Sequence, residues 1–172
     1  MSLGEAWWFV DELIESAPRQ VLEYLSERGI TYRHPEDSRI WVFDGVGSRR
    51  EASLEFVLRE WAAGRQLTMQ TWVDADTDVV VTIEPARSLL TFGLDGLLTS
   101  EAEDVVAALL LGAATRISTR MFVVDRMLPD RGAEWSRVAS GSTATPYEPD
   151  FLLLRGSSGD YVLRMSSSSW LA

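Results

Sequence analysis

Residues 67–85 read LTMQTWVDADTDVVVTIEP, two runs of β-branched and aromatic residues separated by a cluster of aspartates. Side chains alternate along the first run, with Leu67 and Met69 in one set and Thr68 and Gln70 in the other. A period of two is typical of a strand with one buried face. The stretch therefore predicts two strands joined by an acidic hairpin turn, and an antiparallel sheet around them.

The three alternating aspartates, Asp74, Asp76 and Asp78, raise the alternative of a calcium loop. An EF-hand loop needs glycine at its sixth position, a bidentate glutamate at its twelfth and helices on both sides. Counted from Asp74, these positions hold Val79 and Pro85, and the flanks are predicted strands. We favour a solvated hairpin tip, because aspartate side chains accept hydrogen bonds from turn N–H groups. Contact with a weakly bound cation or a basic partner stays open as a further role of this tip.

On the N-terminal side of this hairpin, the patterns predict helices and one further hairpin. The run GEAWWFVDELIE, residues 4–15, predicts a helix, and SAPRQVLEYLSERG, residues 16–29, predicts a second one. The turn-forming residues HPEDS separate two extended runs within residues 30–43, which indicates a hairpin. Ser48 and Glu51 have the spacing of a capping box, so a third helix is expected to begin there.

On the C-terminal side, the pattern changes from strand to helix and back. RSLLTFG, residues 87–93, predicts a strand, and VVAALLLGAATR, residues 105–116, predicts a core helix behind a capping pair of Ser100 and Glu103. RMFVVDR returns to a strand, so residues 87–126 have the order of a strand–helix–strand crossover. The remaining chain predicts a short strand, a loop and a last hairpin, at residues 127–138, 139–150 and 151–165.

Together these elements predict one α+β domain over residues 1–172. A chain of this length buries roughly 70% of its unfolded surface, which is enough for one core. The sheet is expected to be largely antiparallel and packed against three to four helices, with one crossover at residues 87–126 as an open option. Residues 1–3 and 166–172 are expected to be loose ends.

The composition excludes several classes of function. The 26 acidic and 16 basic residues give a net charge of −10, which repels a phosphate backbone, so we expect a basic protein surface and not nucleic acid as the partner. Cysteine, lysine and asparagine are absent, which excludes thiolate, Schiff-base and Walker-lysine chemistry. No apolar run approaches the roughly 18 residues of a membrane span. The first residues lack the basic start of a secretory leader, so a cytoplasmic protein is expected.

Three polar residues are candidates for an anion-binding or polar site. His34 lies beside Glu36 and Asp37, and a neighbouring carboxylate can fix its tautomer. Arg49 and Arg50 follow the glycine-containing junction DGVG at the predicted helix start, where backbone N–H groups can hold an anion. A single histidine without an identifiable nucleophile makes no catalytic set, and we assign no catalytic residue, metal ligand or cofactor.

The aromatic run AWWFV is the more informative feature. Consecutive helical residues point about 100° apart, so four large side chains in a row cannot all face one core. One of these four residues, 7–10, is therefore expected to be exposed. Trp7 and Trp8 are the binding candidates among them, because tryptophan is enriched at interface hot spots. The alternatives are a helix buried on both sides, a homodimer contact, and a surface for a different partner.

These observations rank three functions. The leading hypothesis is a non-catalytic binding protein, such as an immunity-like or antitoxin-like inhibitor of a basic protein, acting through Trp7, Trp8, Asp74, Asp76 and Asp78. The first alternative is a small-molecule-binding domain or enzyme with a pocket between the sheet and the helix at residues 105–116, using His34, Arg49 and Arg50. The second alternative is a structural subunit of a homo-oligomer.

Overall fold

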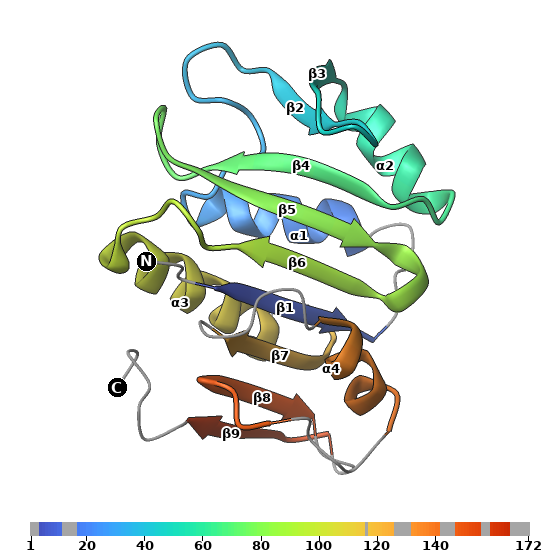
Figure 1. The fold of residues 1–172 in the computed structure, drawn as a ribbon, viewed down its shortest axis with the longest axis vertical. Helices are drawn as coiled ribbons and strands as arrows, with labels where there is room; N and C mark the ends of the chain where they lie inside the picture. The colour runs from blue at the N-terminus through green and yellow to red at the C-terminus, as the bar shows by residue number, and fades with distance from the viewer. Residues whose placement is uncertain are drawn as a thin grey trace.

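In the computed structural model, the chain folds into one antiparallel sheet with helices on both of its faces (Figure 1). The structure describes residues 4–11, 17–115, 117–125, 132–141, 147–155 and 159–165. Within these residues, nine strands follow one another across the sheet in the order β3-β2-β4-β5-β6-β1-β7-β8-β9. The predicted α+β class with a largely antiparallel sheet is confirmed.

Most of the strands are short apolar runs, and most neighbours in sequence are also neighbours in the sheet. β-branched and aromatic side chains suit such half-buried pleated surfaces. The bounds are β1 Glu5–Val10, β2 Ile40–Phe43, β3 Arg49–Ala52, β4 Leu67–Trp72, β5 Asp78–Glu84, β6 Leu89–Gly93, β7 Thr119–Asp125, β8 Phe151–Arg155 and β9 Tyr161–Met165.

The helices divide the molecule into three layers. The bounds are α1 Ala17–Glu27, α2 Leu54–Ala62, α3 Thr99–Thr115 and α4 Gly132–Ala139, with a short 3₁₀ turn at Pro85–Arg87. The larger core lies between the sheet and α1, α2 and α3, and we call this side the three-helix face. A smaller core packs α4 against the other side, the α4 face (Figure 1). None of the helices in the described ranges has the length and apolar character needed to cross a membrane.

The hairpin predicted at residues 67–85 is confirmed. β4 pairs with β5 in register, with Met69 opposite Val81 and Thr68 opposite Thr82. In the turn, the Oδ1 atom of Asp74 accepts hydrogen bonds of 2.8 Å from the backbone N–H groups of Asp76 and Thr77. The first aspartate is therefore a turn-stabilising residue.

The predicted helix at residues 4–15 is wrong, because residues 5–10 form the central strand β1. β1 lies between β6 and β7, with both faces covered. Trp8 belongs to the three-helix core and Trp7 to the α4 core, since successive strand residues point to opposite faces. The exposed fractions are 0% for Trp8 and 1% for each of Trp7, Phe9 and Val10, so the expectation that one of the four is exposed is also wrong.

The hairpin predicted within residues 30–43 is also wrong. Thr31 makes an isolated bridge to Trp72, and β2 pairs with β3 instead. The turn between β2 and β3 is fixed by Asp44, whose Oδ1 atom accepts from the backbone N–H groups of Val46 and Ser48. A short side chain that satisfies two turn N–H groups favours a tight hairpin at this position over a helix start.

The predicted capping boxes are displaced from the true helix starts. α2 begins after Ser53, whose Oγ atom accepts from the backbone N–H of Phe56 at 3.1 Å, and not after Ser48. α3 begins at Thr99, where the Glu101 carboxylate accepts from the backbone N–H of Leu98 at 2.6 Å. The predicted helices are present, but their first turns lie at other residues.

The C-terminal part follows the prediction with one exception. Both β6 and β7 are antiparallel to β1, so they are parallel to each other, and α3 connects them across β1 as a crossover. β8 and β9 form the predicted last hairpin. Residues 132–139, expected within a strand, form α4, which packs Trp135 against the sheet. The predicted loose ends at 1–3 and 166–172 lie outside the described residues.

Candidate functional site

The candidate site is a hollow on the three-helix face, beside α1. α1 buries Val21, Leu22 and Leu25 in the core and leaves Gln20, Glu23 and Glu27 outside, as expected for an amphipathic helix. The hollow has a volume of about 190 Å³. We call it the acidic hollow. It is lined by Gln20, Glu23, Tyr24, Glu27 and Ile117.

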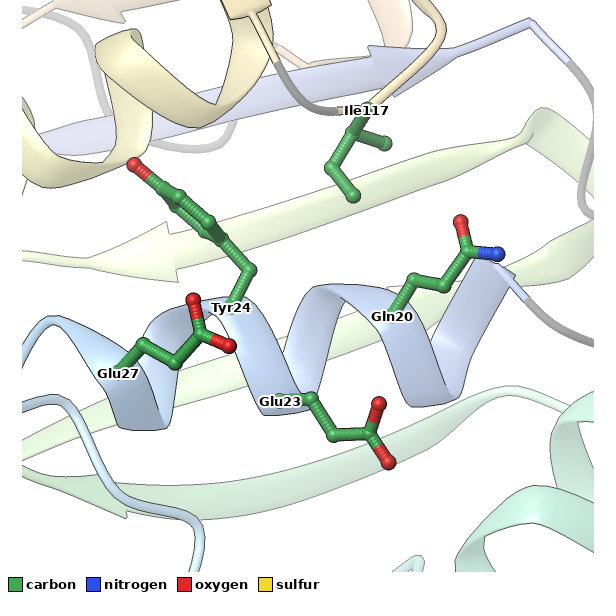
Figure 2. Close-up of a pocket in the computed structure, with 5 residues that line it drawn as sticks. All are labelled: Gln20, Glu23, Tyr24, Glu27 and Ile117. Atoms are coloured by element: carbon green, nitrogen blue, oxygen red, sulfur yellow. The ribbon is translucent and has the colours of Figure 1, made fainter.

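The side chains of the acidic hollow come from two segments far apart in sequence (Figure 2). Four of them project from α1, and Ile117 approaches from the chain that leaves α3. The Glu27 carboxylate turns back toward Tyr24, whereas Glu23 extends away from the tyrosine (Figure 2). The hollow therefore has an apolar wall formed by Tyr24 and Ile117 and an acidic rim.

The wall is held by contacts between α1 and α3. The Tyr24 hydroxyl donates a hydrogen bond of 2.8 Å to the backbone oxygen of Ala108. Gly112 lies directly against the Tyr24 ring, where a Cβ atom would come within 2.5 Å of Cε1. The backbone N–H of Ile117 donates to Gly112 at 3.0 Å, which places Ile117 after the last turn of α3. The shape of the hollow therefore depends on the close packing of two helices.

The charge at the rim is mainly negative. Glu23 and Glu27 are one helical turn apart, and like charges at this spacing repel each other. Arg19 Nη1 lies 3.8 Å from Glu23 Oε1, and both side chains are about half exposed, so the pair is weak. Arg28 places its guanidinium 5.6 Å from the centre of the Tyr24 ring. In the described part of the chain, Glu27 has neither an ion pair nor a side-chain hydrogen bond, so its carboxylate remains an open acceptor.

The hollow is chemically suited to hold a cation. Carboxylates accept charge-assisted hydrogen bonds from guanidinium or ammonium groups, and the tyrosine ring can contact the apolar part of such a side chain. The chain's one histidine, His34, packs against Trp72 on the α4 face, on the other side of the sheet. Within the described residues, no three side chains of His, Asp or Glu gather as metal ligands.

The predicted binding residues are separated by the fold. Trp7 and Trp8 are buried on opposite faces of β1, so we place no binding surface on them. The Asp74 carboxylate is taken up by the turn, where hydrogen bonds from the Asp76 backbone N–H and then from Thr77 lower its pKa. Asp78 accepts a hydrogen bond of 2.8 Å from Gln70. At the hairpin tip, Asp76 is the aspartate whose carboxylate makes no hydrogen bond or ion pair with another described residue.

The three candidates for an anion or polar site are only partly brought together. Arg49 and Arg50 are successive residues of strand β3, so they point to opposite faces of the sheet. Arg50 stacks on Phe56 of α2 at 4.5 Å, and Arg49 stacks on Trp41 at 4.0 Å. His34 and Arg49 both approach the Trp72 ring, at 4.4 Å and 5.8 Å. The helix-start cradle expected for both arginines is therefore wrong.

Sequence reasoning did not select the residues of the acidic hollow. The polar positions Gln20, Glu23 and Glu27 were visible as the outer stripe of a predicted helix, which usually faces solvent. The contribution of Ile117 depends on how α3 returns to the sheet. The acidic hollow lies between α1 and the end of α3, which is a different place from the pocket expected between the sheet and the helix at residues 105–116.

No protein-family model matches the sequence, and no curated protein or solved structure matches the chain.

Proposed function

We propose that the protein is a non-catalytic binding protein that receives a basic side chain of a protein partner in the acidic hollow. The observation that carries the proposal is the position of two carboxylates, on Glu23 and Glu27, at the rim of a hollow with an apolar wall. An arginine is the best fit, because its guanidinium hydrogen-bonds carboxylates while its aliphatic stem packs on apolar surface.

The size of the hollow supports one inserted side chain. Sites for small molecules and cofactors usually measure about 300–1,000 Å³. The acidic hollow, at about 190 Å³, is smaller than this range. A hollow of this size can take one side chain of a partner. Such an inserted side chain is typical of an anchor residue at a protein interface.

The net charge supports the same class of partner. A net charge of −10 attracts a basic protein and speeds its association, and complementary charge excludes acidic partners. A concrete version is an inhibitor that covers a basic site of another protein. In this version the acidic hollow holds an arginine or lysine of the inhibited site.

The proposal is tested with a short oligoarginine peptide, followed by the side-chain amide signal of Gln20 in ¹⁵N NMR spectra. We expect saturable shifts of this signal and weaker binding in the double variant Glu23→Gln, Glu27→Gln. Exposed ion pairs contribute about 0.2–1 kcal/mol each, so the expected loss of affinity is several-fold.

The matched control is the double variant Glu36→Gln, Asp76→Asn, which removes the same charge from two exposed loop positions. If only the hollow variant binds more weakly, the site is located at α1. Equal losses in both variants would show that net charge alone attracts the peptide, and the proposal would be rejected. An oligoglutamate peptide should not shift the Gln20 signal.

A further inference from the structure

A second cluster of polar groups lies on the α4 face, at the end of the sheet formed by β3, β2 and β4. It consists of His34, Trp41, Arg49 and Trp72, which we call the donor cluster. The Arg49 guanidinium lies 4.0 Å from the centre of the Trp41 ring and 5.8 Å from that of Trp72. The His34 ring meets Trp72 edge-on at 4.4 Å. These contacts bring four nitrogen-bearing side chains to one place.

The nitrogen donors of this cluster have no acceptors among the described residues. The Nε1 atoms of Trp41 and Trp72 are buried without a hydrogen-bond partner, and Trp72 is only 5% exposed. Arg49 makes neither an ion pair nor a hydrogen bond with any described residue. His34 Nδ1 accepts from the backbone N–H of Glu36 at 3.3 Å, so the neutral ring carries its proton on Nε2.

Unpaired buried donors are rare in folded proteins, and each one calls for an explanation. One explanation is a ligand that supplies the missing acceptors. On this side of the sheet, the unpaired groups near the cluster are the two indole donors and, on neighbouring β4, the acceptor Gln70 Oε1. A ligand that matches the two indole donors must supply acceptors.

Three carboxylates near the cluster are already engaged. Asp37 and Glu51 both lie near Arg39, at 3.9 Å and 3.6 Å from its Nε atom. The Oδ1 atom of Asp37 is also 3.5 Å from His34 Nδ1. Asp78 accepts from the side-chain amide of Gln70 at 2.8 Å. Arg49 is therefore a positive charge in this region that has no ion pair with a described residue.

We propose that the donor cluster binds a carboxylate-bearing ligand. Stacking on an indole ring leaves the in-plane N–H groups of a guanidinium available, and their fork matches the two oxygens of a carboxylate. Arg49 is exposed and held by ring contacts, so it can turn away from the Trp41 and Trp72 rings and bring a bound carboxylate close to their indole groups. A carboxylate fits better than a phosphate, because the neighbouring acidic groups penalise a second negative charge.

This site is independent of the proposed function. It lies on the other face of the sheet from the acidic hollow, and it selects a ligand of opposite charge. The carboxylate can belong to a free small molecule or to an acidic side chain of a peptide. Both sources share the same recognition chemistry, and the experiment separates them.

The test follows the indole N–H signals of Trp41 and Trp72 in ¹⁵N NMR spectra, assigned with the variants Trp41→Phe and Trp72→Phe. Sodium benzoate is titrated against the intact chain, with sodium chloride at equal ionic strength as reference. We expect saturable shifts of these two indole signals with benzoate alone. Replacing Arg49 by glutamine should weaken binding about tenfold, the loss expected for one charge-assisted bidentate pair.

The control is Arg50→Gln, because Arg50 is the next residue on the same strand but packs on Phe56 at the other face. This variant should bind benzoate as the unmodified protein does. An oligoglutamate peptide forms the second arm, and tighter binding of the peptide than of benzoate identifies an acidic protein segment as the source. Shifts that do not saturate, that sodium chloride reproduces, or that persist unchanged after Arg49→Gln would overturn the proposal.

Discussion

Adding one methyl group at Gly112 should destabilise the protein, because α3 passes α1 and β1 at this residue without space for a Cβ atom. An ideal Cβ would lie 2.5 Å from Tyr24 Cε1 and 2.9 Å from Trp8 Cη2. Carbon atoms pack at about 3.5–4.0 Å, so both rings would have to retreat by roughly 1 Å. Trp8 is fully buried, and the Tyr24 hydroxyl is bonded to Ala108, so neither ring moves easily.

The expected loss follows from two opposing effects. Overpacking of a core costs about 1–3 kcal/mol, whereas alanine is better than glycine in a helix interior by about 0.8–1.0 kcal/mol. The net destabilisation of Gly112→Ala is therefore about 1 kcal/mol, with an upper bound near 2 kcal/mol. In a chain of this size, 1 kcal/mol lowers the melting temperature by about 2–4 °C.

The assay is urea unfolding followed by tryptophan fluorescence. The control is Gly45→Ala, at a turn glycine where a Cβ atom would meet nothing within 4 Å. Because Tyr24 also forms the wall of the acidic hollow, Gly112→Ala should in addition weaken oligoarginine binding. A Gly112→Ala protein as stable as the original, or more stable, would refute the close packing of α3 on α1.

Three further outcomes are expected. Thr119→Val should cost about 1–3 kcal/mol in urea unfolding, because its hydroxyl accepts the buried Trp8 indole N–H at 2.8 Å and valine would leave that donor unpaired. Ser53→Ala removes the N-cap of α2 and should lower the free energy of unfolding by about 1 kcal/mol, measured in the same way. The lowered pKa of Asp74 stabilises the folded state above the carboxyl's ordinary pKa of about 3.9, and this contribution is lost as the pH falls through the lower folded pKa. The melting temperature of Asp74→Asn should therefore approach that of the original protein in acid, and a constant difference at all pH values would contradict this role.

The parts of the fold that could be predicted from the sequence are those with a clear alternation of side chains or a long apolar run. The hairpin at residues 67–85 and the helix of α3 follow from alternation and from a long apolar run. The run AWWFV shows neither the two-residue period of a half-buried strand nor the 3.6-residue period of an amphipathic helix. A central strand is buried on both faces, so its sequence is continuously apolar. Four large side chains that cannot share one helix face were themselves a signal for a strand.

The errors at helix starts have a common physical origin. Serine and aspartate side chains cap helices and tight turns by the same hydrogen bonds to backbone N–H groups. Asp44 fixes a hairpin turn just before Ser48, so the Ser48–Glu51 spacing has no capping role there. The acidic hollow was beyond sequence reasoning because Ile117 joins α1 only through tertiary packing.

The place of β1 has a consequence for the order in which the chain is assembled. Trp8 pairs with Leu90 on one side and Phe122 on the other, so this early strand waits for two partners that are synthesised much later. The strands from β2 to β6 can pair as they leave the ribosome, since each meets a near neighbour in sequence. Until β7 is synthesised, the apolar strand β1 lacks one of the two strands that it pairs with in the sheet. β1 is therefore the segment on which a chaperone, or a competing strand from another copy, would act first.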